Sequence, residues 1–391
     1  MPSSSRNRWP LALVILAVLA VLTGLGLRAT RPRGGAAALR QIHHVFVVMM
    51  ENKDYGEVIG NPSDAPYLNQ DLLPQAAYAS QYFSAVNHGR GDGYSLPNYL
   101  WLVAGTNFGI NNDHAPFGPT GKAINSQPGR DPLVAALEGA GISWRAYLGN
   151  YTAGCPLVNH GHYAVRHDPF VYFQGFTGPN PKQPAAGCGP PHLAPMAQLA
   201  RDLQAGGKRL AAFNFIVPGV CDDMHDDCLG SRGWPDEVIE GDTWLGRYLP
   251  LILRSAAYRR DGAVFILWDE GNFHDGGPLP ALVLSPFAKH GFLDADNRFN
   301  HSSALRTWCE IFGVAPPAAL EAAAAQQPAG GEVAMPDLSA LFMPPPAGVG
   351  PTIWFWVAGL LLLAAILTAV AGRARRAPGT PAEEPIENAR S

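Results

Sequence analysis

Two pairs of polar residues come directly after apolar runs of the sequence. Glu51 and Asn52 follow the run Val45–Met50, and a second apolar run, much later in the chain, ends in Asp269 and Glu270. A short run rich in valine is typical of a strand buried on both faces of a parallel sheet, and ligands bind beyond the carboxyl ends of such strands. Three carboxylates and one amide oxygen suit a hard divalent cation. We therefore predict a divalent metal cation at these four residues, although either pair alone is also explained by a cap or a solvated strand end.

Ser95 stands at the start of a predicted helix, within the stretch Gly93–Tyr99. Pro97 is tolerated there because the first turn of a helix leaves its N–H groups without intrahelical partners. These N–H groups and the positive end of the helix dipole attract an anion such as phosphate. A serine hydroxyl beside a metal ion can lose its proton and attack a phosphate ester. Ser95 is thus a predicted nucleophile, and the simpler explanation is a helix cap.

Two histidines are candidates for proton transfer or for contact with a phosphoryl oxygen. His225 lies beyond a predicted strand that ends at Val217, so it also belongs to a carboxyl end. Histidine suits proton donation to a leaving group, and the alternative is a surface histidine paired with a neighbouring aspartate. His167 is a weaker candidate of the same kind. His301 follows the second acidic strand end and could reach the same site.

The elements that must position these residues alternate between strands and helices. Predicted strands are Val45–Met50, Ser143–Tyr147, Leu210–Val217, Ala263–Trp268 and Ala281–Ser285, and predicted helices are Leu96–Val103, Pro132–Ala140, Pro195–Ala205, Asp242–Ser255 and Ser302–Phe312. Asp242 is the predicted cap of its helix. This alternation predicts an α/β fold with a mainly parallel sheet sandwiched by helices. The long loop Gly149–Pro191 is expected to line the site.

Composition and charge limit the function further. The chain has 391 residues, a net charge of −4 and a pI of about 6.3, which argues against nucleic acid as a partner. The histidines all lie between His43 and His301, so the chemistry is expected in the middle of the chain. The predicted organisation is a signal peptide or anchor with a basic linker (1–40), a globular domain that would carry the chemistry (41–314), an Ala/Pro/Gly-rich stalk (315–351), a transmembrane helix (352–371) and a cytoplasmic tail (372–391).

Both ends of the chain carry long apolar segments. Trp9–Leu27 has the length of a signal peptide or an uncleaved anchor, and Thr352–Ala371 has the length of a membrane span, with arginines directly after it. The arginines predict a cytoplasmic C-terminus and a central domain outside the cell membrane. An oxidising compartment makes two disulfides reasonable, Cys221–Cys228 and Cys155–Cys188, with Cys309 left over.

The chain resembles the bacterial phosphoesterase family that contains acid phosphatases and phospholipases C. The likeness covers roughly residues 42–313. The segments that carry it, in the family's order, are Met49–Tyr55, Ser95–Leu100, Arg166–Phe170, Phe215–Pro218 with Asp223–Asp226, Gly241–Leu245, Trp268–Gly271 and Leu284–Ala288.

This resemblance implies an alkaline-phosphatase-like fold and a role for each predicted site residue. The four strand-end residues would bind the metal, and Ser95 would transiently become phosphoserine. His225 and His167 would contact the phosphoryl group or its leaving oxygen. The sequence Leu-Pro-Asn-Tyr after the serine is closer to the acid phosphatase branch than to the phospholipase branch. The family often has His-Pro directly before the serine, whereas this chain has Gly93-Tyr94.

The expected protein is therefore a metal-dependent phosphoesterase that hydrolyses phosphate monoesters, like an acid phosphatase, on the outer side of the membrane. Its expected partners are a phosphate-ester substrate and the membrane, through one or two terminal helices. Two alternatives stay open at this point. One is a phospholipase C that acts on phospholipid head groups, and the other is a non-catalytic cell-surface binding protein of the same fold.

Overall fold

The computed structural model describes residues 35–86, 94–190, 192–206, 209–230, 234–272, 277–326 and 335–344. These residues all belong to one compact unit that ends at Pro344. Both apolar terminal segments lie outside the described residues, as do His88, Arg90 and His274. Within the described ranges, no helix combines the length and the apolar character that a membrane span requires.

The strands are β1 (His44–Met50), β2 (Ala77–Ala79), β3 (Tyr82–Phe83), β4 (Trp144–Leu148), β5 (Leu193–Pro195), β6 (Phe213–Val217), β7 (Gly262–Trp268), β8 (Ala281–Leu284), β9 (Phe292–Asp294) and β10 (Phe299–Asn300). The α-helices are α2 (Ala36–Leu39), α3 (Tyr55–Val58), α4 (Ser95–Ala104), α5 (Leu133–Gly139), α6 (Gln174–Thr177), α7 (Met196–Ala205), α8 (Trp234–Leu253), α9 (Ala256–Asp261), α10 (His301–Phe312) and α11 (Ala318–Gln326). Shorter helical turns are η1 (Tyr67–Leu72), η2 (Leu73–Gln75), η3 (Val165–His167), η4 (Pro169–Tyr172) and η6 (Leu338–Leu341).

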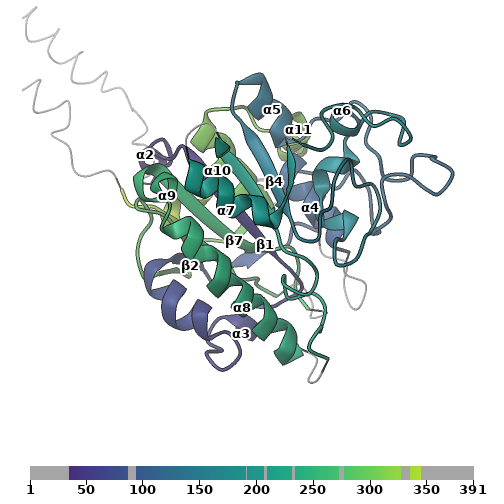
Figure 1. Ribbon diagram of the computed structural model, residues 1–391. Helices are drawn as coiled ribbons and strands as arrows, with labels where there is room; N and C mark the ends of the chain where they lie inside the picture. Colours follow the sequence, from purple (N-terminus) through teal and green to yellow (C-terminus); the bar gives the residue numbers. More distant parts are fainter. Residues whose placement is uncertain are drawn as a thin grey trace, which may run out of the picture. The chain divides into compact units, whose positions relative to one another are not determined.

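Eight strands form one sheet in the order β5-β4-β6-β1-β7-β8-β2-β9 (Figure 1). The five strands from β5 to β7 are all parallel to one another, which confirms the predicted α/β fold with a mainly parallel sheet. Strand β8 differs, because it runs antiparallel to both β7 and β2. The central strands β1 and β7 are buried along almost their whole length, as their unbroken apolar sequences predict.

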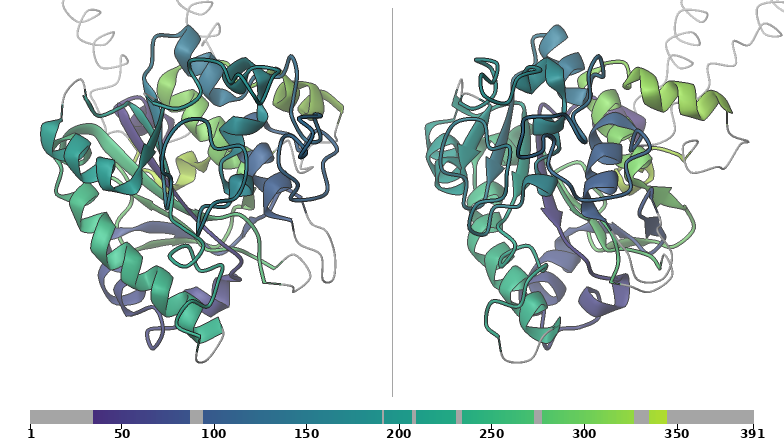
Figure 2. Two further views of the ribbon diagram at one scale, coloured as in Figure 1. Left: turned by 45° about the vertical axis from the view of Figure 1, so that its right-hand side comes forward. Right: turned by 90° about the vertical axis from the view of Figure 1, so that its right-hand side faces the viewer.

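Helices cover the two faces of the sheet. One layer is α8 with α7 and α9 beside it, and the other contains α4, α5 and α10, which pack against one another (Figure 2). Local signals fix the ends of several of these helices. Asn300 caps α10 by accepting a hydrogen bond from the Ser302 N–H, and α4 ends at Gly105, whose left-handed backbone suits glycine.

The prediction that Asp242 starts a helix is wrong. Helix α8 begins at Trp234, and Asp242 lies inside it. Its carboxylate instead accepts hydrogen bonds from the backbone N–H groups of Tyr67 and Leu68, at 2.9 and 2.8 Å, and so caps η1. The local sequence cannot tell an aspartate that caps its own helix from one that caps another segment. Here the capped backbone, at Tyr67 and Leu68, comes from a distant part of the chain.

The last described segment, residues 335–344, packs on the domain. Leu338, Leu341 and Phe342 are buried in the core. The Lys289 N–H donates to the Leu341 carbonyl at 3.0 Å, and the Leu338 N–H donates to Thr307 Oγ1 at 2.8 Å. This segment therefore contributes side chains to the same core as the strands.

A buried aspartate on α7 supports a prediction about stability. Asp202 accepts hydrogen bonds from Arg145 (2.6 Å), Tyr147 (2.9 Å) and Gln198 (2.7 Å), which joins α7 to β4. Asp202→Asn removes the charge that the Arg145 guanidinium faces. We expect the free energy of unfolding to fall by about 2 kcal/mol. Urea unfolding followed by circular dichroism checks this, and an unchanged midpoint would contradict it.

Candidate active site

The candidate site lies at the carboxyl ends of four adjacent parallel strands. In the order β4, β6, β1 and β7, these strands lead into the loops that carry His167, His225, the pair Glu51 and Asn52, and the pair Asp269 and Glu270. The structure therefore brings together the polar residues that come from widely separated parts of the sequence. Parallel neighbours place equivalent strand ends at one edge of the sheet, and a ligand site at that edge is the general expectation for such folds.

Ser95 is the first residue of α4, and its side chain points to the acidic centre of the site. Its hydroxyl donates to Glu51 Oε2 at 3.1 Å, and the Tyr99 hydroxyl, one turn further along α4, donates to Glu51 Oε1 at 2.6 Å. Ser95, Tyr99 and Glu51 are all buried. The residue before the helix is Tyr94, which makes no side-chain cap hydrogen bond. Ser95 thus sits one position inside the helix and is not its N-cap, which argues against the simpler explanation of this serine.

The end of β7, which carries Asp269 and Glu270, lies beside Asn52 and α4. The Asn52 backbone N–H donates to Asp269 Oδ1 at 3.3 Å, and Asn98 Nδ2 donates to Glu270 Oε2 at 3.2 Å. Helix α4 therefore contacts both acidic strand ends, through Ser95 on one side and Asn98 on the other. Asn52 has a left-handed backbone, with φ of 51°, a conformation that asparagine tolerates better than most residues.

The two predicted histidines differ in how deeply their side chains are buried. His167 is buried, with Nε2 at 3.3 Å from Glu51 Oε1 and Nδ1 at 3.4 Å from Asp223 Oδ2, and its ring stacks on Tyr99. The side chain of His225 is 24% exposed, with Nδ1 at 2.6 Å from Asp226. Burial lowers the pKa of both imidazoles. Both rings are therefore expected to be neutral at pH 7, with His225 on the solvent side.

Three further residues complete the site and were not among the predicted ones. Asp223 faces His167, Arg166 Nη2 lies 2.9 Å from His225 Nε2, and Asp113 Oδ1 accepts a hydrogen bond from the Leu96 N–H at 3.0 Å. Asp223 and Arg166 lie inside segments that carry the family resemblance, so that signal was available. Asp113 comes from a loop without any such motif, and its position depends on tertiary structure alone.

His301 does reach the neighbourhood of the site, through the backbone. Its Nε2 lies 2.7 Å from the Asp269 carbonyl oxygen and its Nδ1 lies 2.9 Å from the Tyr82 hydroxyl, both in the buried core. With a carbonyl as acceptor, Nε2 carries the proton and Nδ1 accepts from the tyrosine. His301 therefore supports the loop that carries Asp269.

Both predicted disulfides are confirmed. Cys155 is bonded to Cys188 and Cys221 to Cys228, while Cys309 is a free, buried thiol. The second disulfide closes the loop that carries Asp223 and His225. Disulfides of this kind form in oxidising compartments, which supports a location outside the cytoplasm.

The charges of the site fit a divalent cation. Burial is the largest cause that raises the pKa of Glu51, Asp223 and Glu270, and it raises the pKa of Asp269 to about 7. In addition, Asn52 Oδ1 and Asp269 Oδ2 are buried without a hydrogen-bond partner in the described structure. Buried carboxyl and amide oxygens, two of them without a hydrogen-bond partner, are donors that suit a hard cation, and a bound cation would favour the ionised carboxylates.

A second group of donor atoms lies beside the first. The side-chain ligand atoms of Glu51, His167 and His225 are all within 4.8 Å of one another. Glu51 thus belongs to both groups, with the predicted set of strand-end oxygens on one side and the two imidazoles on the other. The structure fits a cation at this place and leaves the number of ions open.

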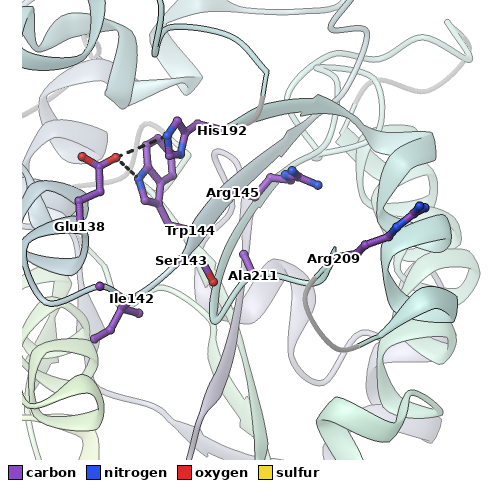
Figure 3. Close-up of a pocket in the computed structure, with 9 residues that line it drawn as sticks. Glu138, Ile142, Ser143, Trp144, Arg145, His192, Arg209 and Ala211 are labelled. Carbon is purple, nitrogen blue, oxygen red and sulfur yellow. Dashed lines mark hydrogen bonds and ion pairs between the residues drawn. The ribbon is translucent and has the colours of Figure 1, made fainter.

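A separate hollow lies at the amino ends of the strands. This cavity of about 340 Å³ is lined by residues at the amino ends of β4 and β6, including Trp144 and Arg145 (Figure 3). Three of its polar side chains contact one another, because Glu138 accepts from Trp144 Nε1 at 2.7 Å and lies 3.6 Å from His192 Nε2. The cavity is separate from the acidic strand ends, so its size gives no reason to move the candidate site.

A hydroxyl at a helix start, held among buried carboxylates at parallel strand ends, is an arrangement that suits the hydrolysis of phosphoric esters. Comparison with known proteins agrees. The profile of the Phosphoesterase family matches residues 61–315, and the chain belongs to this family. The resemblance predicted from the sequence is therefore confirmed.

Individual relatives are distant. The chain is 27% identical over 307 residues to the phosphatidylinositol-3-phosphatase of Mycobacterium tuberculosis, and the match covers 78% of this chain and 88% of the relative. It is 23% identical over 232 residues to the phosphate-repressible acid phosphatase of Penicillium chrysogenum, covering 58% of this chain but only 47% of that protein. Among solved structures, a protein in the alkaline phosphatase superfamily from Vibrio parahaemolyticus matches with 13% identity and a TM-score of 0.47, over 70% of this chain and 67% of that chain.

Proposed function

We propose that the protein is a metal-dependent phosphomonoesterase that uses Ser95 as its nucleophile, on an alkaline-phosphatase-like fold. One observation carries this proposal: the Ser95 hydroxyl lies 3.1 Å from Glu51, inside a cluster of buried carboxylates that comes from neighbouring strand ends. A serine with only a structural role has no need of such neighbours. The proposed metal ligands are Glu51, Asn52, Asp269 and Glu270.

The proposed reaction has two steps. In the first, the Ser95 hydroxyl gives its proton to Glu51, its Oγ forms a bond to phosphorus, and the bond from phosphorus to the alcohol oxygen breaks. The departing alcohol takes up a proton from solvent water on the exposed side of the site, where His225 lies. In the second step a water molecule attacks the phosphorus of the phosphoserine and gives one proton to solvent. The leaving serine oxygen takes back the proton from Glu51, and inorganic phosphate is released. A divalent cation, when bound, lowers the pKa of the attacking hydroxyl and neutralises charge on the phosphoryl oxygens.

The chain's own residues have distinct tasks in this scheme. His167 lies against Glu51 and Asp223, and as a neutral imidazole it can give its one N–H to one of these two carboxylates. The Arg166 guanidinium favours the ionised forms of Glu51 and Asp223, and it is the positive group that a phosphoryl oxygen would meet on the solvent side. Tyr99 holds Glu51 from the helix side.

The relatives support monoesters as substrates. Both the mycobacterial and the fungal relative are named as phosphatases, and the mycobacterial name describes a phosphorylated lipid head group. We also place the enzyme outside the cytoplasm. The apolar segments Trp9–Leu27 and Thr352–Ala371 would hold it at the membrane. The two disulfides support the oxidising side.

The substrate class is tested with two chromogenic esters in parallel. The full chain, purified in detergent, is assayed with p-nitrophenyl phosphate and with p-nitrophenylphosphorylcholine, each with and without added Mg²⁺, Ca²⁺ or Mn²⁺. We expect the monoester to be cleaved faster by at least tenfold, which is a difference of about 1.4 kcal/mol in transition-state stabilisation. Faster cleavage of the choline diester would assign the chain to the phospholipase C activity instead. Absence of turnover with every cation would favour a surface-binding protein.

A further inference from the structure

Lys53 is a buried lysine that directly follows the proposed metal ligands Glu51 and Asn52 in the sequence. Its side chain is 1% exposed, and its ammonium group lies 2.7 Å from the Met224 carbonyl oxygen, 2.7 Å from Glu237 Oε2 and 3.1 Å from the Asn52 carbonyl oxygen. A lysine ammonium has three N–H donors, and here each has one acceptor. The group is therefore fully satisfied without contact to solvent or to the Ser95 hydroxyl.

Two of these acceptors belong to residues with an uncommon backbone. Asn52 has φ of 51° and Met224 has φ of 79°, so both are left-handed without being glycine. Such residues persist only where the surrounding structure holds them. Each stands at the point where its loop turns toward the site, Asn52 directly after Glu51 and Met224 between Asp223 and His225. Lys53 thus binds the carbonyl oxygen of both turning points.

The same two loops are also joined to each other and to α8. The Glu51 N–H donates to the Asp223 carbonyl at 2.8 Å, and the His225 N–H donates to Asp223 Oδ1 at 3.0 Å. On the helix, Glu237 pairs with Lys53, and a Cβ atom at Gly241 would lie 2.3 Å from the Met224 side chain. The ammonium group is therefore the point at which the β1 loop, the β6 loop and α8 meet.

We propose that Lys53 is a positioning residue, whose ammonium group holds the Asn52 and Met224 turns in the arrangement that brings Glu51, Asp223 and His225 around the reacting phosphoryl group. This inference rests on the function proposed above for the Ser95 site. It differs from a role in stability alone, because the buried ion pair with Glu237 could be replaced by apolar side chains without loss of stability, whereas the two carbonyl contacts could not.

Three variants separate these roles. Lys53→Met removes the ammonium group and leaves Glu237 buried without its partner, so this variant is expected to lose stability whichever role is correct. The double variant Lys53→Met/Glu237→Met removes the whole pair and is expected to recover the part of the melting temperature that the single variant loses through the unpaired Glu237. Lys53→Arg keeps a positive charge and several donors and is expected to recover part of the activity.

The decisive measurements are made on the double variant of the full chain. We expect kcat for p-nitrophenyl phosphate to be reduced at least tenfold, since misplacement of site groups by about 1 Å can cost 10²-fold. We also expect the midpoint of a Mg²⁺, Ca²⁺ or Mn²⁺ titration, followed by melting temperature, to move to at least tenfold higher concentration. Without added cation, amide exchange in residues 220–226 should be faster than in the wild type, with α10 unchanged.

The inference is overturned if the double variant keeps wild-type kcat, cation midpoint and amide exchange, whether or not its melting temperature changes. Lys53 would then only balance Glu237. The exchange and cation measurements do not depend on turnover. If the wild-type protein cleaves no ester but the double variant still shows faster exchange and a weaker cation midpoint, the proposed function fails and the positioning role stands.

Discussion

Ser95→Ala is expected to reduce kcat for phosphate monoesters by at least about 10³-fold, the scale on which removal of a nucleophile acts in other hydrolases. The substitution removes the one oxygen that would bond to phosphorus and leaves the Tyr99 hydroxyl on Glu51, so the carboxylate keeps a partner. The fold is expected to persist, because Ser95 is not the cap of α4. Steady-state assays with p-nitrophenyl phosphate, together with circular dichroism, check both parts of this expectation.

Ser255→Ala is the matched control for this experiment. Ser255 caps α9 by accepting a hydrogen bond from the Tyr258 N–H at 3.1 Å, on a helix that contains none of the proposed site residues. Its loss should cost about 1 kcal/mol of stability and leave kcat unchanged. If Ser95→Ala behaved in the same way, with normal turnover and reduced stability, the serine would be structural and another group would have to be the nucleophile.

Removal of the cation is expected to have the second large effect. After treatment with a chelator, turnover should fall at least 100-fold and return when a divalent cation is added. The cation should also raise the melting temperature, since a ligand at 100 times its Kd stabilises the folded state by about 2.7 kcal/mol. The physical reason is the cost of holding Glu51, Asp223, Asp269 and Glu270 together in a buried site.

Asp269→Asn tests the same site by mutation. The amide can still accept the hydrogen bond from the Asn52 N–H, so the loop keeps its contact while one negative charge is lost. We expect the cation titration midpoint to rise at least tenfold. Asp202→Asn is the control, because it neutralises an equally buried carboxylate on α7, outside the site. A wild-type cation midpoint in Asp269→Asn would remove this residue from the set of ligands.

The sequence predicts the centre of the fold well, because burial on both faces leaves a direct trace in composition. The apolar runs before Glu51 and Asp269 are β1 and β7, and they are neighbours in the sheet. Strand direction leaves no such trace. The apolar run at Ala281 has a composition similar to that of the parallel strands β1 and β7, yet β8 is antiparallel to β7. Direction depends on the connection between the strands and not on which side chains are buried.

Some residues of the site could be predicted from the sequence, and others depend on tertiary contacts. Glu51 and Asp269 were identifiable because an acid directly after a buried strand must lie at the sheet edge. Asp223 lies among Asp222, Asp226 and Asp227, and apart from the family resemblance nothing in the local sequence distinguishes it. It is selected by the backbone hydrogen bond from the Glu51 N–H to its carbonyl oxygen, which forms only after the β1 and β6 loops meet. The contacts of Lys53 with Met224 and Glu237 could not be predicted from the sequence either, because they also join segments that are far apart in the chain.

The disulfide between Cys221 and Cys228 has a consequence for when the enzyme becomes active. In a reducing cytoplasm both cysteines stay as thiols, and the loop with Asp223 and His225 lacks its covalent closure. A newly made chain would then carry an incomplete site during synthesis and would complete it only after transfer to an oxidising compartment. Such a delay would spare the phosphate esters of the producing cell from a hydrolase that is meant to act elsewhere.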